Sequence, residues 1–116
     1  GCRMIKIEEG KRTPLKYTVA DHLQIPEEAA KLIEEKKEKE FQMAYQKGED
    51  LYLIKGYGRQ MSGGYSIQVT DLSASVNAVF FETKLIGPTE EVQGGEPSYP
   101  YIVVKTEYRD VPVQFQ

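Results

Sequence analysis

The sequence predicts an α+β fold, in which a mostly antiparallel sheet of about five to six strands carries one helix packed on one face. Three observations lead to this prediction. One stretch has the apolar spacing of a helix, several later stretches alternate apolar and polar residues, and no internal repeat is visible. The chain of 116 residues is long enough for one domain with a modest core.

The helix is predicted over residues 26–39. Pro26 suits its first turn, because the first N–H groups of a helix have no partner within it and proline lacks that group. Acidic residues follow Pro26 and lysines lie near the other end, as the helix dipole favours. The residues that share the apolar face are Ile25, Ala29, Leu32 and Ile33. The mixed charges over residues 34–40 are interpreted as a solvated helix face.

The strands are recognised by alternation of apolar and polar residues. Residues 15–19 are predicted as a half-buried strand before the helix. Residues 51–55 have apolar groups on both faces, which indicates an interior strand covered on both sides. The strands predicted after the helix span residues 41–45, 51–55, 65–70, 76–86, 99–106 and 111–115.

Turns and breakers divide these strands. Residues 47–50 are predicted to close a hairpin, and residues 87–98 to form a long mobile loop. Within 76–86, the predicted core face carries Val79, Phe81 and Leu85, whereas Phe80 faces the opposite side. Because Pro112 has no N–H, the last strand is predicted at a sheet edge or to start there.

Composition excludes several classes of function. The net charge of −3 argues against nucleic acid as the main partner, since phosphate binding depends on clustered lysine and arginine. One cysteine and one histidine permit no intrachain disulfide and argue against a zinc site. His22 is interpreted as a surface residue before the helix, because no nucleophile or orienting acid lies near it in sequence. The sequence thus predicts no catalytic residue, no metal site and no cofactor.

The first residues, Gly1-Cys2-Arg3, look like the start of a bacterial lipoprotein after its signal peptide is removed. We therefore expect Cys2 to carry lipid, residues 1–14 to be a tether, and residues 15–116 to form a single domain. This places the domain outside the cytoplasm, anchored to the cell membrane. The alternative is an ordinary cysteine at an arbitrary starting point, and Gly1 can be native or a cloning remnant.

Two motifs carry a family resemblance. Residues 56–69 read Gly-Tyr-Gly-Arg-Gln-Met-Ser-Gly-Gly-Tyr-Ser-Ile-Gln-Val, and residues 99–105 read Tyr-Pro-Tyr-Ile-Val-Val-Lys. With Gly87-Pro88 between them, they resemble the PrcB C-terminal-like family over about residues 51–106. Ser62 stands where that family more often has threonine, and Arg59-Gln60-Met61 replaces a more typical Lys-Pro stretch.

The resemblance implies a secreted or lipid-anchored bacterial domain, named after the PrcB subunit of a spirochaete surface protease complex. It therefore implies association with a protease or an envelope complex. It brings no catalytic residues that could be carried over to this chain.

The same two motifs supply the candidate binding residues. Their glycines could pass for a phosphate cradle, but a strand follows them rather than a helix, so we interpret them as turn, bulge or close-approach positions. Tyrosines can form a recognition surface or simply pack across strands, and both alternatives stay open. The candidate partner-binding residues are Tyr57, Met61, Gly63, Gly64, Tyr65, Pro97, Tyr99, Pro100 and Tyr101.

The leading hypothesis is a non-enzymatic domain that binds or stabilises a partner protein, with a surface protease complex as one such partner. The alternative hypothesis is a module that binds cell-wall glycans through surface tyrosines. The sequence also leaves open strand addition at the edge strand near the C-terminus and a homodimer, since apolar residues lie on both predicted sheet faces.

Overall fold

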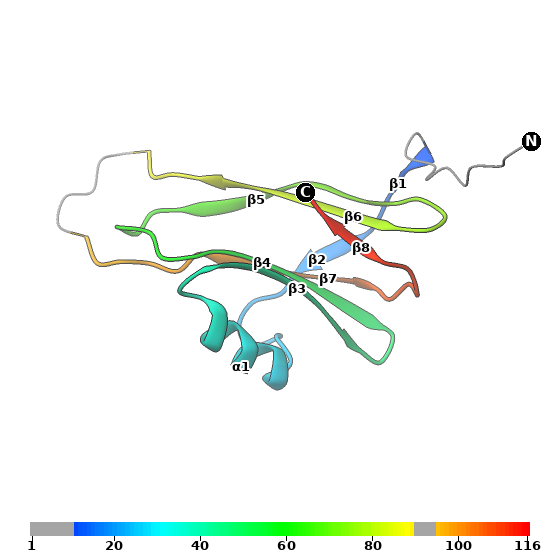
Figure 1. Cartoon of the computed structure of the whole chain (residues 1–116), viewed down its shortest axis with the longest axis horizontal. Coiled ribbons are helices and arrows are strands. Elements are labelled where there is room, and N and C mark those ends of the chain that lie inside the picture. The colour runs from blue at the N-terminus through cyan, green and yellow to red at the C-terminus, as the bar shows by residue number, and fades with distance from the viewer. Residues whose placement is uncertain (1–10, 90–94) are drawn as a thin grey trace, which may run out of the picture.

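The computed structural model describes residues 11–89 and 95–116, which form two stacked sheets with a helix beneath them (Figure 1). The elements are β1 Thr13–Pro14, β2 Tyr17–Val19, α1 Glu27–Lys36, β3 Glu40–Lys47, β4 Asp50–Tyr57, β5 Ser66–Ala74, β6 Val79–Ile86, β7 Tyr101–Glu107 and β8 Val113–Phe115. The α+β class, the dominance of antiparallel pairing and the single helix among the described residues confirm the predicted class.

The predicted strand count was wrong, because the described residues form eight strands in two sheets. The strand order is β1-β5-β6-β8 in one sheet, which we call the outer sheet, and β2-β7-β4-β3 in the other, the central sheet. The undercount has a physical cause. A strand as short as β1, which has two residues, shows no periodicity, and pairing between distant segments decides which sheet each strand joins.

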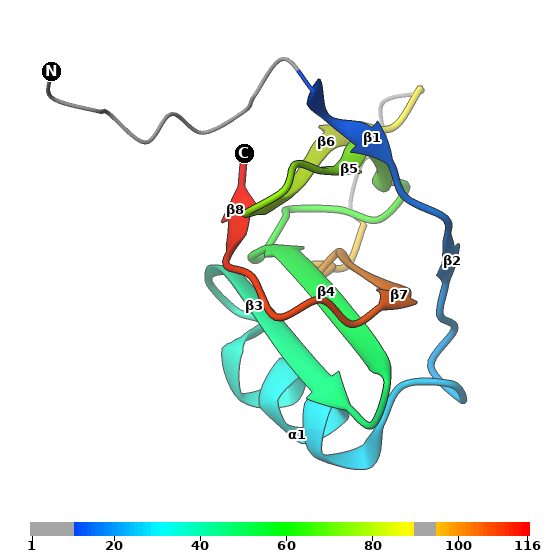
Figure 2. The ribbon, with the colours of Figure 1, turned by 90° about the vertical axis from the view of Figure 1, so that its right-hand side faces the viewer.

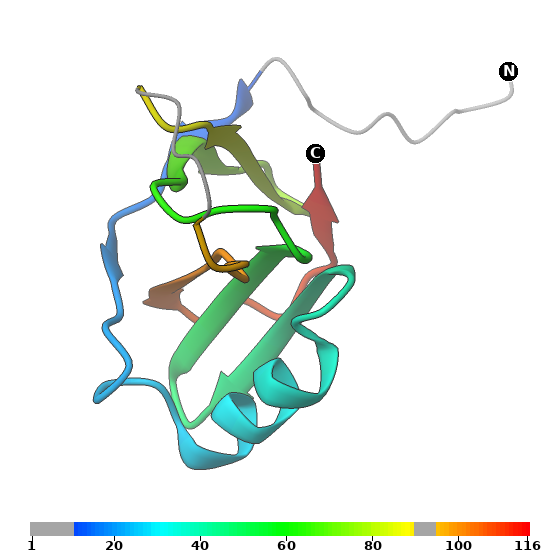
Figure 3. The same cartoon turned by 90° about the vertical axis from the view of Figure 1, so that its left-hand side faces the viewer.

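The central sheet lies between the helix and the outer sheet, as the two end-on views show (Figures 2 and 3). Alternating residues of β4 divide between two cores. Tyr52 and Ile54 join the cluster between the helix and the central sheet, whereas Leu51 and Leu53 join the cluster between the two sheets. The prediction that residues 51–55 form a strand covered on both sides is confirmed.

The helix confirms Ile25, Ala29 and Ile33 of the predicted apolar face, whereas Leu32 lies outside this core cluster, and the helix is shorter than predicted. Ala29 and Ile33 are fully buried, and Ile25 is buried just before the first turn. The helix ends at Lys36, and the Lys39 N–H donates to the Lys36 carbonyl in a turn that leads directly into β3. The three residues predicted beyond Lys36 therefore form the connection.

Five of the predicted strands begin one to three residues too early, and two of these corrections have a clear physical reason. Residues 17–19 form β2, but all three are exposed rather than half-buried, because β2 is the edge of the central sheet beyond the reach of the outer sheet's long strands. Leu15 instead packs in the core between the sheets. The strand predicted from residue 76 begins at Val79, since residues 75–78 form the turn after β5.

Phe80 shows how the outer face of the outer sheet is covered. Val79 and Phe81 are buried in the core between the sheets, as predicted. Phe80 points the other way and is also buried, with the Arg12 guanidinium carbon 3.6 Å from its ring centroid. A cation stacked on an aromatic ring both shields the ring and stays solvated.

The remaining connections follow the sequence closely. The hairpin turn at residues 47–50 is confirmed, with Lys47 paired to Asp50. The β8 strand begins directly after Pro112 and lies at the edge of the outer sheet, as the proline predicted. Residues 90–94 of the predicted long loop lie outside the described residues, and so does the predicted lipidation site Cys2.

Candidate functional site

The two motif segments meet at one end of the sheet sandwich, which we call the loop end (residues 57–65 and 95–101; Figure 3). Gln60 and Ser98 exchange backbone hydrogen bonds of 2.8 and 3.1 Å. The Ser98 hydroxyl donates to the Ser62 carbonyl at 2.6 Å, and the Tyr57 N–H donates to the Pro100 carbonyl at 3.0 Å. Segments that are about forty residues apart in sequence are thus joined by backbone contacts.

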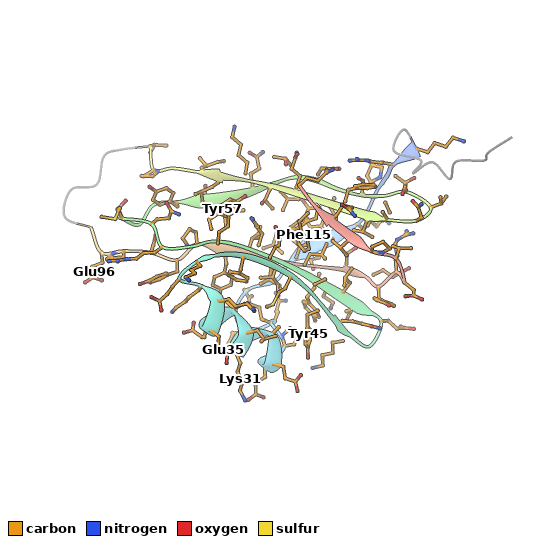
Figure 4. The ribbon with its side chains drawn as sticks, in the orientation of Figure 1. Lys31, Glu35, Tyr45, Tyr57, Glu96 and Phe115 are labelled. Atoms are coloured by element: carbon orange, nitrogen blue, oxygen red, sulfur yellow. The ribbon has the colours of Figure 1, made fainter. Side chains whose placement is uncertain are left out.

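Tyr57 links the two sheets through a side-chain hydrogen bond. Its side chain points from β4 toward the outer sheet, and its hydroxyl shares a hydrogen bond of 2.5 Å with the Thr83 hydroxyl on β6 (Figure 4). The Lys55 ammonium lies 5.2 Å from the Tyr57 ring centroid. Because the ring is half-buried and its hydroxyl is engaged, the contribution of Tyr57 is to hold the two sheets together.

Tyr101 lies on the opposite face of the central sheet from Tyr57. Tyr101 pairs with Gly56, and side chains of neighbouring strands at paired positions share a face. Val103, which follows Tyr101 by two residues, packs beneath the helix, so Tyr101 also faces the helix side. Tyr101 is 36% exposed. The candidate tyrosines are therefore divided between two faces rather than gathered in one patch.

Tyr99 connects the loop end to the helix. The Lys37 ammonium lies 5.1 Å from the centroid of the half-buried Tyr99 ring and also pairs with Glu34 at 3.1 Å. Lys37 caps the C-terminal end of the helix, where a cation is favoured. The sequence interpretation counted Lys37 as part of a solvated face and missed this contact, because no local pattern links a helix end to a distant loop.

Glycines at the loop end meet backbone requirements, as the turn interpretation predicted. Gly58 has φ +76°, and a Cβ there would lie 3.0 Å from the Glu40 amide nitrogen. Gly64 has φ +86°, and its Cβ would lie 2.9 Å from the Pro88 Cβ. At each of these two positions, the positive φ and the close contact both disfavour a residue with a Cβ. Gly63 differs, since a Cβ there would meet nothing within 4 Å.

The accessible part of the loop end is smaller than the candidate list. Met61 is 79% exposed and Pro97 is also exposed, whereas Tyr65 and Pro100 are half-buried. Tyr65 lies near Gly87, at the start of the long loop. We use the name loop-end surface for Met61, Pro97 and Tyr101, the candidate side chains that are exposed.

The described residues contain no candidate metal site. No group of three histidine, cysteine, aspartate or glutamate side chains among them could hold a metal ion.

Burial and the hydrogen bond to Glu28 raise the pKa of Tyr45, and burial and Asp110 raise the pKa of Tyr108. His22 lies exposed in the turn before the helix. In the part of the chain that is described, no helix combines the length and apolarity needed to cross a membrane.

Comparison with known families identifies the segment that builds the loop end. The family model described as PrcB C-terminal matches residues 51–107. This match confirms the resemblance to the PrcB C-terminal family that the sequence motifs predicted. The match runs from β4 to β7, so it contains the Tyr57–Thr83 contact and both motif segments. Of the five long strands of the sandwich, it includes every one except β3. No curated protein and no solved structure matches the chain.

Proposed function

We propose that this chain is a PrcB-like accessory domain that binds or stabilises a partner protein, and that it does so without catalysing a reaction. The observation that carries the proposal is the loop end itself. Backbone hydrogen bonds, the Tyr57–Thr83 contact and two sterically required glycines hold it rigidly, while Met61 and Tyr101 remain accessible. A preorganised aromatic and methionine surface suits protein recognition, because little conformational entropy is lost on binding.

Lipid attachment at Cys2 and an extracytoplasmic location complete the proposal. They are supported by the sequence Gly1-Cys2-Arg3 and by what the resemblance to the PrcB C-terminal-like family implies. The partner would then be an envelope or surface protein, with a protease complex as the first candidate. Mass analysis of the native protein from its membrane fraction tests this part, and an unmodified Cys2 there would contradict it.

Partner binding is tested by affinity capture from an envelope extract, with the full chain as bait. We expect Met61→Asp to remove a specifically enriched protein, because it places a charge in the loop-end surface. Val76→Asp is the matched control, since Val76 is 80% exposed and lies at the opposite end of the sandwich. Tyr57→Ala is unsuitable here because it also removes a contact between the sheets. Equal capture by both aspartate variants would contradict the proposed surface.

Cell-wall glycan binding is the second candidate, favoured by Tyr99 and Tyr101 on the same side of the loop end. Exposed aromatic rings can stack on sugar rings, and Tyr101 has an exposed face for this purpose. It predicts sedimentation of the chain with insoluble cell wall and loss of sedimentation in Tyr101→Ala. If the wild-type chain stays in the supernatant, the glycan proposal fails and the protein-partner proposal is unaffected.

A further inference from the structure

The free edge of β5 stands apart from the other long edges of the fold. On one side β5 pairs with β6 along its length. On the other side it pairs with β1 only at Ser73 and Ala74, and the Leu72 carbonyl accepts the Leu15 N–H. The chain then leaves the outer sheet to form β2 in the central sheet. Within the described residues, the stretch Ser66–Thr70 therefore has no strand on that side.

This edge lacks the protection that the β3 edge shows. Proteins commonly guard an edge strand with charged side chains that point toward the core. On β3, Glu40 and Gln42 point toward the outer sheet and bind the Lys55 ammonium at 2.8 and 3.3 Å. The stretch Ser66–Thr70 contains no charged residue, no proline and no glycine, and its inward side chains are aliphatic. Such a segment favours pairing with another strand.

The stretch Ser66–Thr70 is complementary to itself. Its side chains alternate in burial, with Ile67 and Val69 half-buried and Ser66, Gln68 and Thr70 exposed. In antiparallel pairing of two copies centred on Gln68, Ile67 of one copy lies opposite Val69 of the other. Ser66 then lies opposite Thr70, so polar and aliphatic positions match across the pair. A register shift between Val69 and Asp71 ends the regular stretch.

Aliphatic residues beside this edge would also gain cover. Val19, at the edge of the central sheet, is 58% exposed, and Ile102 on β7 is half-buried in the core between the sheets. In Figure 2 the chain runs from β1 in the outer sheet to β2 at the edge of the central sheet, so a strand added along β5 would lie on this side of the sandwich. Its inward Ile67 and Val69 would thus face aliphatic rather than charged neighbours.

We propose that two copies of this chain form a two-fold dimer by antiparallel pairing of β5 around Gln68. The surface involved differs from the loop-end surface, so the dimer does not depend on the proposed partner binding. It also differs from the dimer that the sequence suggested through a bare sheet face, since that face is covered by the second sheet. The contact is short, and we expect a weak, reversible dimer.

Analytical ultracentrifugation of the full chain, from about 10 µM to about 1 mM, tests the proposal in the range expected for small interfaces. The wild-type chain should dimerise with increasing concentration. Gln68→Lys places like charges opposite each other on the two-fold axis and should raise the dissociation constant by about fivefold or more. An equimolar mixture of Gln68→Lys and Gln68→Glu should restore association, because the charges then attract.

Gln114→Lys is the matched control, since it adds the same charge on an exposed position of β8 at the opposite edge of the same sheet. It should leave the dissociation constant unchanged. A wild-type chain that stays monomeric over the whole range would overturn the proposal. A dimer that Gln68→Lys does not weaken, or that the charge-reversed mixture does not restore, would overturn it as well.

Discussion

Replacing Tyr57 by phenylalanine should destabilise the fold although it removes only a hydroxyl. In the wild-type chain this hydroxyl and that of Thr83 satisfy each other between the two sheets. A typical hydrogen bond contributes about 1 kcal/mol, and leaving the partner unsatisfied adds about 1–2 kcal/mol when it is buried. Because Thr83 is half-buried and water can reach part of it, we expect a total loss of about 1–2 kcal/mol.

The matched control is Tyr101→Phe, the same substitution on the opposite face of the central sheet. The Tyr101 side chain is 36% exposed, so its loss of a hydroxyl should change the free energy of unfolding by less than about 0.5 kcal/mol. Urea denaturation followed by circular dichroism measures both variants. The double variant Tyr57→Phe, Thr83→Val completes a cycle, in which we expect a coupling of about 1 kcal/mol between the two side chains.

Equal stability of Tyr57→Phe and Tyr101→Phe would refute the claim that the Tyr57 hydroxyl stabilises the contact between the sheets. A coupling near zero in the cycle would do the same. The Tyr57–Thr83 contact would then not stabilise the loop end, and Tyr57 would again be a candidate for partner binding.

Three further predictions concern stability. Gly58→Ala should lower the free energy of unfolding by about 2–4 kcal/mol, and Gly48→Ala by only about 1–2 kcal/mol. Both glycines have positive φ, but only at Gly58 would an added Cβ meet backbone atoms. Urea denaturation measures the difference. The raised pKa of Tyr45 means that the folded chain holds this proton more tightly than the unfolded chain. Its stabilising contribution is therefore complete below pH 10 and is lost as the pH rises above that value, and Tyr45→Phe should flatten this part of a stability–pH curve. Leu53→Ala, at a fully buried position, should cost about 2–5 kcal/mol, and a loss below 1 kcal/mol would contradict the core between the sheets.

Local patterns in the sequence predicted the elements that short-range physics determines. The apolar face of the helix, the strand covered on both sides at residues 51–55 and the edge position of the strand after Pro112 all follow from periodicity and backbone chemistry. The second sheet could not be predicted in this way. Whether Leu51 and Tyr52 face a helix or another sheet depends on strand pairing across the whole chain.

The same distinction applies to the loop end. The two motif segments lie side by side in the structure, and their role in binding stays a prediction. The positive φ of Gly58 and Gly64 agrees with their interpretation as turn glycines. The division of Tyr57 and Tyr101 between opposite faces depends on the register of β4 against β7, which no local pattern reveals. Contacts such as that of Lys37 with Tyr99 depend on where the helix ends relative to a distant segment.

The most direct test of the central claim is site-specific photocrosslinking on the cell surface. A photoreactive residue at position 61 should crosslink one reproducible protein partner, because Met61 is the most exposed hydrophobic side chain of the loop-end surface. The same residue at position 76, equally exposed at the other end of the sandwich, should not crosslink that protein. Crosslinking of the same protein from both positions, or of none from position 61, would contradict the account.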